Sequence, residues 1–167
     1  MNKRLIAIIC LQILLLFTIV GKYYYVAATG KLITIETAPI DPRDLFYGDY
    51  VTLNYEISSI ERSSVETDLE TDAYLNRGTA VYVVLEKKKE PFYEAVGVYK
   101  KEQLIAPGQV MLKGKLNYSD EYQFNITYGL ERYYVPENTG REIEAHTKVD
   151  IRVTEGGEAV IEAIRGK

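Results

Sequence analysis

The sequence contains very few of the side chains that most often bind metals or act as nucleophiles. Among its 167 residues, Cys10 is the single cysteine and His146 is the single histidine. One cysteine excludes a disulfide within the chain, and these two side chains are too few for ordinary zinc ligation. The sequence also lacks a G-x-S-x-G elbow, which argues against a Ser-His-Asp hydrolase. We therefore predict no metal site and no cofactor, and we assign no catalytic residue.

Acidic residues are absent from the first 28 residues, whereas the basic residues Lys3, Arg4 and Lys22 lie there. The rest of the chain holds 17 basic and 24 acidic residues, a net charge of −7. A body with this charge repels phosphate, which argues against nucleic acid as a partner. The division into an acid-free leader and an acidic body also argues against a plain cytosolic enzyme.

The leader is dominated by one apolar run at residues 5–20, LIAIICLQILLLFTIV, in which Gln12 is the single amide. A membrane span needs about 20 apolar residues. The run reaches this length by including the aromatic stretch at residues 23–28, since Lys22 can extend its ammonium group to the interface and tyrosines favour that region. We therefore predict an N-terminal transmembrane helix and assign residues 1–28 to a membrane anchor.

The basic residues before the apolar run determine the expected orientation. By the positive-inside rule, Lys3 and Arg4 keep the N-terminus in the cytoplasm, so residues 29–167 form an extracytoplasmic domain. We favour an uncleaved, single-pass signal anchor. A signal peptide cut after residues 26–28 is a second interpretation, which the bulky tyrosines at 23–25 disfavour. A buried core helix is a third, and the absence of a polar face disfavours it.

Apolar and polar residues alternate through most of the body, and β-branched and aromatic residues, including 15 tyrosines, are frequent. This pattern is typical of half-buried strands. Residues 137–148 are predicted as a short helix, and residues 58–76 as a surface loop or short helix. The predicted fold class is all-β, mainly an antiparallel sandwich or barrel with one short helix, following the N-terminal transmembrane helix. The predicted strands are residues 31–37, 49–57, 79–86, 92–100, 110–118, 122–128, 149–154 and 159–164.

Two segments of the body resemble a known family. Residues 38–55 read APIDPRDLFYGDYVTLNY, and their last eight residues match letter for letter the signature of the GDYXXLXY family of membrane-anchored proteins. Residues 128–137, YGLERYYVPE, and residues 140–144, GREIE, resemble a second conserved segment of that family. We call residues 38–55 the first block and residues 128–144 the second block.

The resemblance implies a bacterial cell-membrane protein with a polytopic membrane protein as its partner, and it implies no particular reaction. From the residues themselves, Pro39 and Pro42 prevent regular strand pairing and Gly48 is free to take a left-handed backbone angle. The first block therefore either stiffens a corner of the sheet or presents a site. The candidate interaction motif consists of Pro42, Arg43, Asp44, Gly48, Asp49, Tyr50, Leu53, Tyr55, Tyr128, Gly129, Glu131, Tyr134 and Glu137.

Three functional hypotheses follow from these features. The preferred one is a non-enzymatic binding or assembly module that contacts a membrane protein partner through the two blocks. The second is a cell-envelope enzyme with a pair of carboxylates, drawn from Asp44, Asp49, Glu131 and Glu137. The third is a ligand-sensing module, marked by a pocket that tyrosines line.

Overall fold

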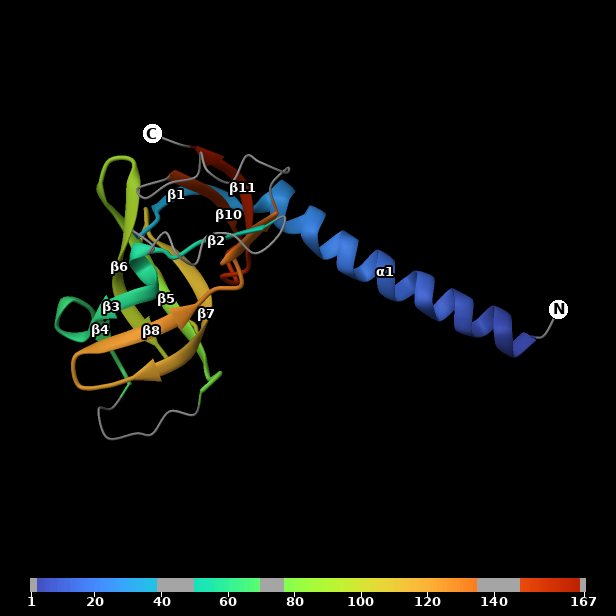
Figure 1. The fold of residues 1–167 in the computed structure, drawn as a ribbon, viewed down its shortest axis with the longest axis horizontal. Helices are drawn as coiled ribbons and strands as arrows, with labels where there is room; N and C mark the ends of the chain where they lie inside the picture. Colours follow the sequence, from blue (N-terminus) through green and yellow to red (C-terminus); the bar gives the residue numbers. More distant parts are fainter. Residues whose placement is uncertain (1–2, 39–49, 70–76, 135–147, 166–167) are drawn as a thin grey trace.

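The structure is a computed structural model that describes residues 3–38, 50–69, 77–134 and 148–165. A long helix, α1 (Lys3–Thr29), projects away from a strand-rich body (Figure 1). The helix is long and apolar enough to cross a membrane. Its 27 residues, at ~1.5 Å each, span about 40 Å, which exceeds the ~30 Å hydrocarbon core of a bilayer. When α1 crosses a membrane, its last turns therefore extend beyond the hydrocarbon toward the body.

The end of α1 lies directly against the body. The Gly30 N–H donates to the Val26 carbonyl at 2.9 Å, and β1 (Lys31–Glu36) begins at the next residue. Val26 is 2% exposed. A Cβ atom on Gly30 would lie 2.6 Å from the Val26 carbonyl oxygen and 2.9 Å from the Cβ atom of Arg152. Glycine is therefore required where α1 meets β10 (Lys148–Val153).

The body contains one curled main sheet and one small sheet. Besides β1 and β10, its strands are β2 (Tyr50–Thr52), β3 (Ser59–Glu61), β4 (Glu66–Thr67), β5 (Ala80–Lys89), β6 (Phe92–Tyr99), β7 (Val110–Ser119), β8 (Gln123–Thr127), β9 (Arg132–Tyr134) and β11 (Ala159–Arg165). Within the described residues, the main sheet has nine strands in the order β11-β10-β1-β6-β5-β7-β8-β3, with β4 beside β6. The small sheet pairs β2 with β9.

Most neighbouring strands in the main sheet are antiparallel, such as β1 with β10, β5 with β6 and β7 with β8. β1 and β4 run parallel to β6, so the sheet is mixed. The predicted all-β class with an N-terminal apolar helix is confirmed. The predicted strands at residues 31–37, 79–86, 92–100, 110–118, 122–128, 149–154 and 159–164 each correspond to one observed strand.

The main sheet curls until the β10–β11 hairpin meets β7. The Lys113 N–H of β7 donates to the Gly157 carbonyl in the hairpin turn at 2.8 Å. Gly157 has a φ angle of 80°, and a Cβ atom there would lie 2.9 Å from the Lys113 nitrogen. Glycine therefore permits both the turn and the close approach of the two strands. Among the largest fully buried side chains of the core are those of Tyr55, Phe124, Ile35, Leu85, Leu112, Leu116, Ile126 and Ile151.

The predicted strand at residues 49–57 is wrong in length. β2 pairs with β9 and ends at Thr52. Beyond Thr52 the chain changes partner, because Tyr55 forms a bridge with Thr37 at the end of β1. A 3-10 turn, η2 (Glu56–Ser58), follows. One continuous strand is therefore replaced by a short strand that connects two different parts of the body.

Two other predicted segments are described in part. The described portion of residues 58–76 is neither a surface loop nor an α-helix. It contains β3, β4 and one 3-10 turn, η3 (Arg62–Ser64), and Ile60 and Leu69 are each 4% exposed in the core. The predicted helix at residues 137–148 lies outside the described residues except for Lys148, which begins β10.

Candidate functional site

The first block contributes alternate side chains to the core. Leu53 is 3% exposed, Tyr55 is 0% exposed and Ile57 just beyond the block is 4% exposed, whereas the residues between them are exposed. The Tyr55 hydroxyl donates to the Leu130 carbonyl at 2.6 Å. Burial raises the pKa of Tyr55 well above its usual value, and the negative charge of Glu131 raises it further. The leucine and the last tyrosine of the signature therefore stabilise the fold, with the hydroxyl as a neutral donor.

The second block forms hydrogen bonds with the first block and with Ile57 just beyond it. The Tyr128 hydroxyl donates to the Ile57 carbonyl at 2.6 Å, and the Leu53 N–H donates to the Glu131 carbonyl at 2.7 Å. Burial is the main cause that raises the pKa of Tyr128, with a further contribution from Glu131. Together with the β2–β9 pairing, these bonds join two segments that lie far apart in the sequence.

A turn between β8 and β9 orients the second block. Gly129 has a φ angle of 79°, which favours glycine. The Glu131 carboxylate accepts the Tyr128 N–H at 2.5 Å and so holds the turn closed. Tyr128, Gly129 and Glu131 also line the cleft described below.

Other members of the candidate interaction motif are placed as follows. Tyr50 and Tyr134 are opposite each other in the β2–β9 pair. Of the four carboxylates considered for an enzyme, Glu131 alone belongs to the described part of the chain, so the carboxylate-pair hypothesis stays a prediction. Outside the described residues lie Pro42, Arg43, Asp44, Gly48, Asp49 and Glu137.

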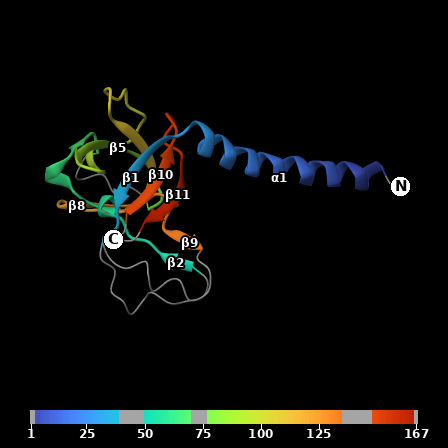
Figure 2. The same ribbon diagram turned by 90° about the horizontal axis from the view of Figure 1, so that it is seen from above.

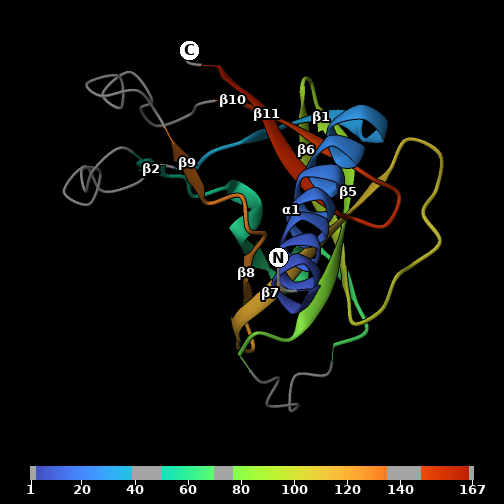
Figure 3. The same ribbon diagram turned by 90° about the vertical axis from the view of Figure 1, so that its right-hand side faces the viewer.

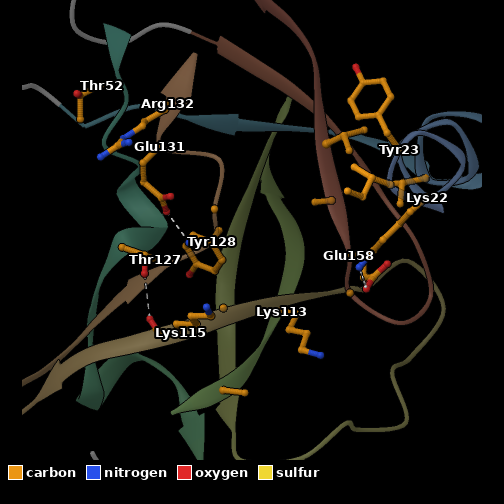
Figure 4. A pocket seen from close by; sticks show the side chains of 18 residues that line it. Lys22, Tyr23, Thr52, Lys113, Lys115, Thr127, Tyr128, Glu131, Arg132 and Glu158 are labelled. Atoms are coloured by element: carbon orange, nitrogen blue, oxygen red, sulfur yellow. Dashed lines mark hydrogen bonds and ion pairs between the residues drawn. The ribbon is translucent and has the colours of Figure 1, made fainter. Parts of the chain in front are cut away.

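A cleft of about 1040 Å³ lies between the last turns of α1 and the body (Figure 4). The curled sheet provides its floor, and the second block forms one wall. Apolar side chains from α1 and from β11 line the side next to the helix. Its polar lining includes Lys22 and Tyr23 from α1, Lys113 and Lys115 from β7, Arg132 from β9 and Glu158 from the β10–β11 hairpin.

Basic side chains predominate in this cleft, in contrast to the acidic body. The Lys22 Nζ atom forms an ion pair with a Glu158 carboxylate oxygen at 2.6 Å, so these two charges offset each other. The Lys113 Nζ atom lies 5.8 Å from the centre of the Tyr82 ring. Lys115 adds a second exposed ammonium group from the same strand. The excess positive charge therefore comes mainly from the side of the cleft that the body provides.

No motif in the sequence marks the lysines of this cleft as functional. Lys113 and Lys115 alternate along β7 with the buried residues Leu112, Gly114 and Leu116, so the period-two pattern places both lysines on the outer face. Their proximity to α1 depends on the curl of the sheet, which the pattern within one strand does not specify. The ligand-sensing hypothesis stays a prediction: two tyrosines, Tyr23 and Tyr128, line this cleft, but its charged lining is mainly basic.

These features define a strand-rich domain attached to an apolar N-terminal helix, with two sequence blocks joined next to the helix end. The GDYXXLXY protein family model matches residues 12–164, so the chain belongs to this family. The matched segment begins within α1 and ends within β11, and it includes both blocks. No curated protein and no solved structure matches the chain.

Proposed function

We propose that this protein is a single-pass membrane protein whose strand-rich domain lies outside the cytoplasm and assembles with a second, polytopic membrane protein. The observation that carries the proposal is the position of the joined blocks. β2 and β9 stand to one side of the main sheet, at the end of the body that adjoins α1 (Figure 2, Figure 3). A protein embedded in the same membrane reaches this end of the body first.

Contacts at the end of α1 support an uncleaved anchor at residues 1–28. The helix continues through residues 26–28 without interruption. Val26 is buried against the body, and its carbonyl accepts the Gly30 N–H. Cleavage after residue 28 would remove these contacts and the Lys22 partner of Glu158.

The expected orientation rests on charge. Lys3 and Arg4 precede the apolar run, and acidic residues are absent from the first 28 residues. Positive charge next to a span favours the cytoplasmic side. Residues 29–167 are accordingly assigned to the outside of a bacterial cell membrane, as the family resemblance implies.

A binding role fits the chemistry of the described part of the blocks. The hydroxyls of Tyr55 and Tyr128 donate to backbone carbonyls, and the Glu131 carboxylate holds a turn. These side chains stabilise the shape of the β2–β9 pair. The signature accordingly builds a shaped surface, and the exposed residue Thr52 lies on it.

Site-specific photocrosslinking in intact membranes tests this assignment. A photoreactive amino acid replaces Thr52 on β2, and the matched control replaces Tyr122, which is 76% exposed beyond β7 and before β8. We expect the Thr52 variant to form a discrete product with one integral membrane protein that resists carbonate extraction. The Tyr122 variant is expected to form no such product.

Two results would contradict the assignment. One is a Thr52 variant that forms no product with an integral membrane protein; Thr52 also lines the cleft, so a lipid product beside the protein product leaves the assignment standing. The other is the same membrane product from both positions, because the contact would then not be specific to the β2–β9 pair.

A further inference from the structure

The cleft between α1 and the body lies at the level of the membrane surface when α1 crosses a bilayer. A span of about 20 residues that begins at Leu5 ends close to Lys22 and Tyr23, which line the cleft. Lysine and tyrosine are typical of the lipid–water interface. The cleft therefore opens where phospholipid headgroups lie.

The lining of the cleft is amphipathic, as a phospholipid is. Ile19 of α1 and Val160 of β11 provide apolar surface next to the helix. Lys113 and Lys115 provide ammonium groups on the side away from the helix (Figure 4). A volume of about 1040 Å³ is at the upper end of ordinary ligand pockets, so a headgroup and the first part of its acyl chains fit within it.

The two lysines are arranged to bind one anion together. They are separated by Gly114 on β7, so their side chains leave the same face of the strand about 7 Å apart along it. Gly114 itself faces the core, where a Cβ atom would lie 2.5 Å from a methyl group of Ile126. Lys22 and Glu158, which also line the cleft, form an ion pair at 2.6 Å and together add no net charge to it.

The positive charge of the cleft contrasts with the negative charge of the body as a whole, and this difference affects contact with lipid. Residues after position 28 carry a net charge of −7, and an acidic surface is repelled by anionic headgroups. The charged side chains that line the cleft, Lys22, Lys113, Lys115 and Arg132 against Glu131 and Glu158, carry a net charge of +2, opposite in sign to the body as a whole.

We propose that this cleft binds the phosphate headgroup of an anionic phospholipid from the leaflet next to the body, with Lys113 and Lys115 binding the phosphate. Ile19 precedes Lys22 along α1 and so lies on its membrane side, where it contacts the upper part of the acyl chains. The bound lipid fills the space between the helix and the body and so holds the body close to the membrane despite its negative charge. The inference depends on α1 as a membrane span and not on the protein partner.

Lipid retention by the full-length protein in a neutral detergent tests the proposal. The protein is mixed with equal amounts of phosphatidylglycerol and phosphatidylcholine, separated from free micelles, and the lipids retained are measured by mass spectrometry. The double variant Lys113→Gln/Lys115→Gln is compared with Lys88→Gln/Lys89→Gln, which removes two exposed lysines from the end of β5. Thermal unfolding of both variants is measured to establish that they are folded.

We expect the wild type and the β5 variant to prefer phosphatidylglycerol, and the β7 variant to lose about tenfold or more of that preference, as two lost contacts with an anionic surface imply. Equal preference in the two variants would overturn the proposal. So would displacement of the lipid by millimolar inorganic phosphate or glycerol phosphate, because the ligand would then be a soluble phosphate. Loss of the Thr52 crosslink in the β7 variant with its lipid preference intact would also overturn it, since the cleft would then contact protein.

Discussion

Two tyrosines connect the family blocks at the scale of single residues. Tyr55 of the first block donates to the backbone of the second, and Tyr128 of the second donates to Ile57 just beyond the first. The Tyr55 side chain is 0% exposed, so its hydroxyl satisfies a carbonyl in a water-poor environment, where an unmade hydrogen bond is expensive. A signature that ends in tyrosine is thus explained by a specific bond and not only by the size of the side chain.

Removal of the Tyr55 hydroxyl is expected to destabilise the protein without changing its shape. Tyr55→Phe leaves the Leu130 carbonyl without its donor, which costs about 1–3 kcal/mol in the free energy of unfolding. Tyr122→Phe, at an exposed position, is the control and is expected to change it by less than about 0.5 kcal/mol. Denaturant unfolding of the full chain in detergent measures both. Equal stability of the two variants would contradict the assigned role of the hydroxyl.

The same tyrosines predict how stability depends on alkaline pH. The pKa values of Tyr55 and Tyr128 are raised in the folded protein, mainly by burial. The unfolded chain releases these protons at about pH 10, whereas the folded chain keeps them. Their contribution to the free energy of unfolding is therefore complete below about pH 10. It is lost as the pH rises further, by about 1.4 kcal/mol per pH unit for each tyrosine.

Unfolding measured between pH 9 and pH 11.5 tests this dependence. Tyr55→Phe is expected to show a shallower loss of stability than the wild type, because one of the two buried protons is absent. Identical slopes would show that Tyr55 ionises equally in both states.

At the scale of elements, the junction between α1 and β10 determines how the helix meets the body. The Lys22–Glu158 ion pair is exposed at both ends, so it contributes little by itself. The buried Val26 and the close approach at Gly30 are the stronger constraints. The position of the cleft therefore depends on a glycine and a valine more than on charge.

A methyl group at Gly30 is expected to disturb this junction. Gly30→Ala would place its Cβ atom 2.6 Å from the Val26 carbonyl oxygen, so the helix end or β10 must shift. We expect a loss of about 1–3 kcal/mol in the free energy of unfolding. Gly21→Ala is the matched control, since a Cβ atom there meets nothing within 4 Å. A Gly30→Ala variant as stable as the control would show that the junction is not tightly packed.

Local patterns explain which elements could be predicted from the sequence. The long strands β5 and β7 alternate in polarity over many residues, and α1 is apolar throughout, so each was predicted without knowledge of its neighbours. β9 has three residues and exists because it pairs with β2, which itself ends where the chain changes partner. Such short strands depend on contacts between distant segments, and polarity along the chain does not reveal them.

At the scale of the whole molecule, some features of the candidate site are visible in the sequence and others depend on contacts between distant segments. The family signature was recognisable as letters, but the burial of Leu53 and Tyr55 emerges only from the folded body. The cleft is lined both by Lys22 of α1 and by Lys113 of a strand far along the chain. The acid-free leader and the acidic body are thus joined at a basic boundary that composition alone does not indicate.

Both proposed contacts require an uncleaved N-terminal helix that anchors the body in a membrane, and the proposed partner contact also requires that the body lies outside the cytoplasm. The most direct measurement is labelling of intact cells with a membrane-impermeant maleimide, using a Tyr122→Cys variant in which Cys10 is replaced by serine. Tyr122 is 76% exposed and lies on the body. We predict labelling of a full-length chain that stays in the membrane after carbonate extraction. Labelling only after cell lysis, or a labelled product that lacks the first 28 residues, would contradict the account.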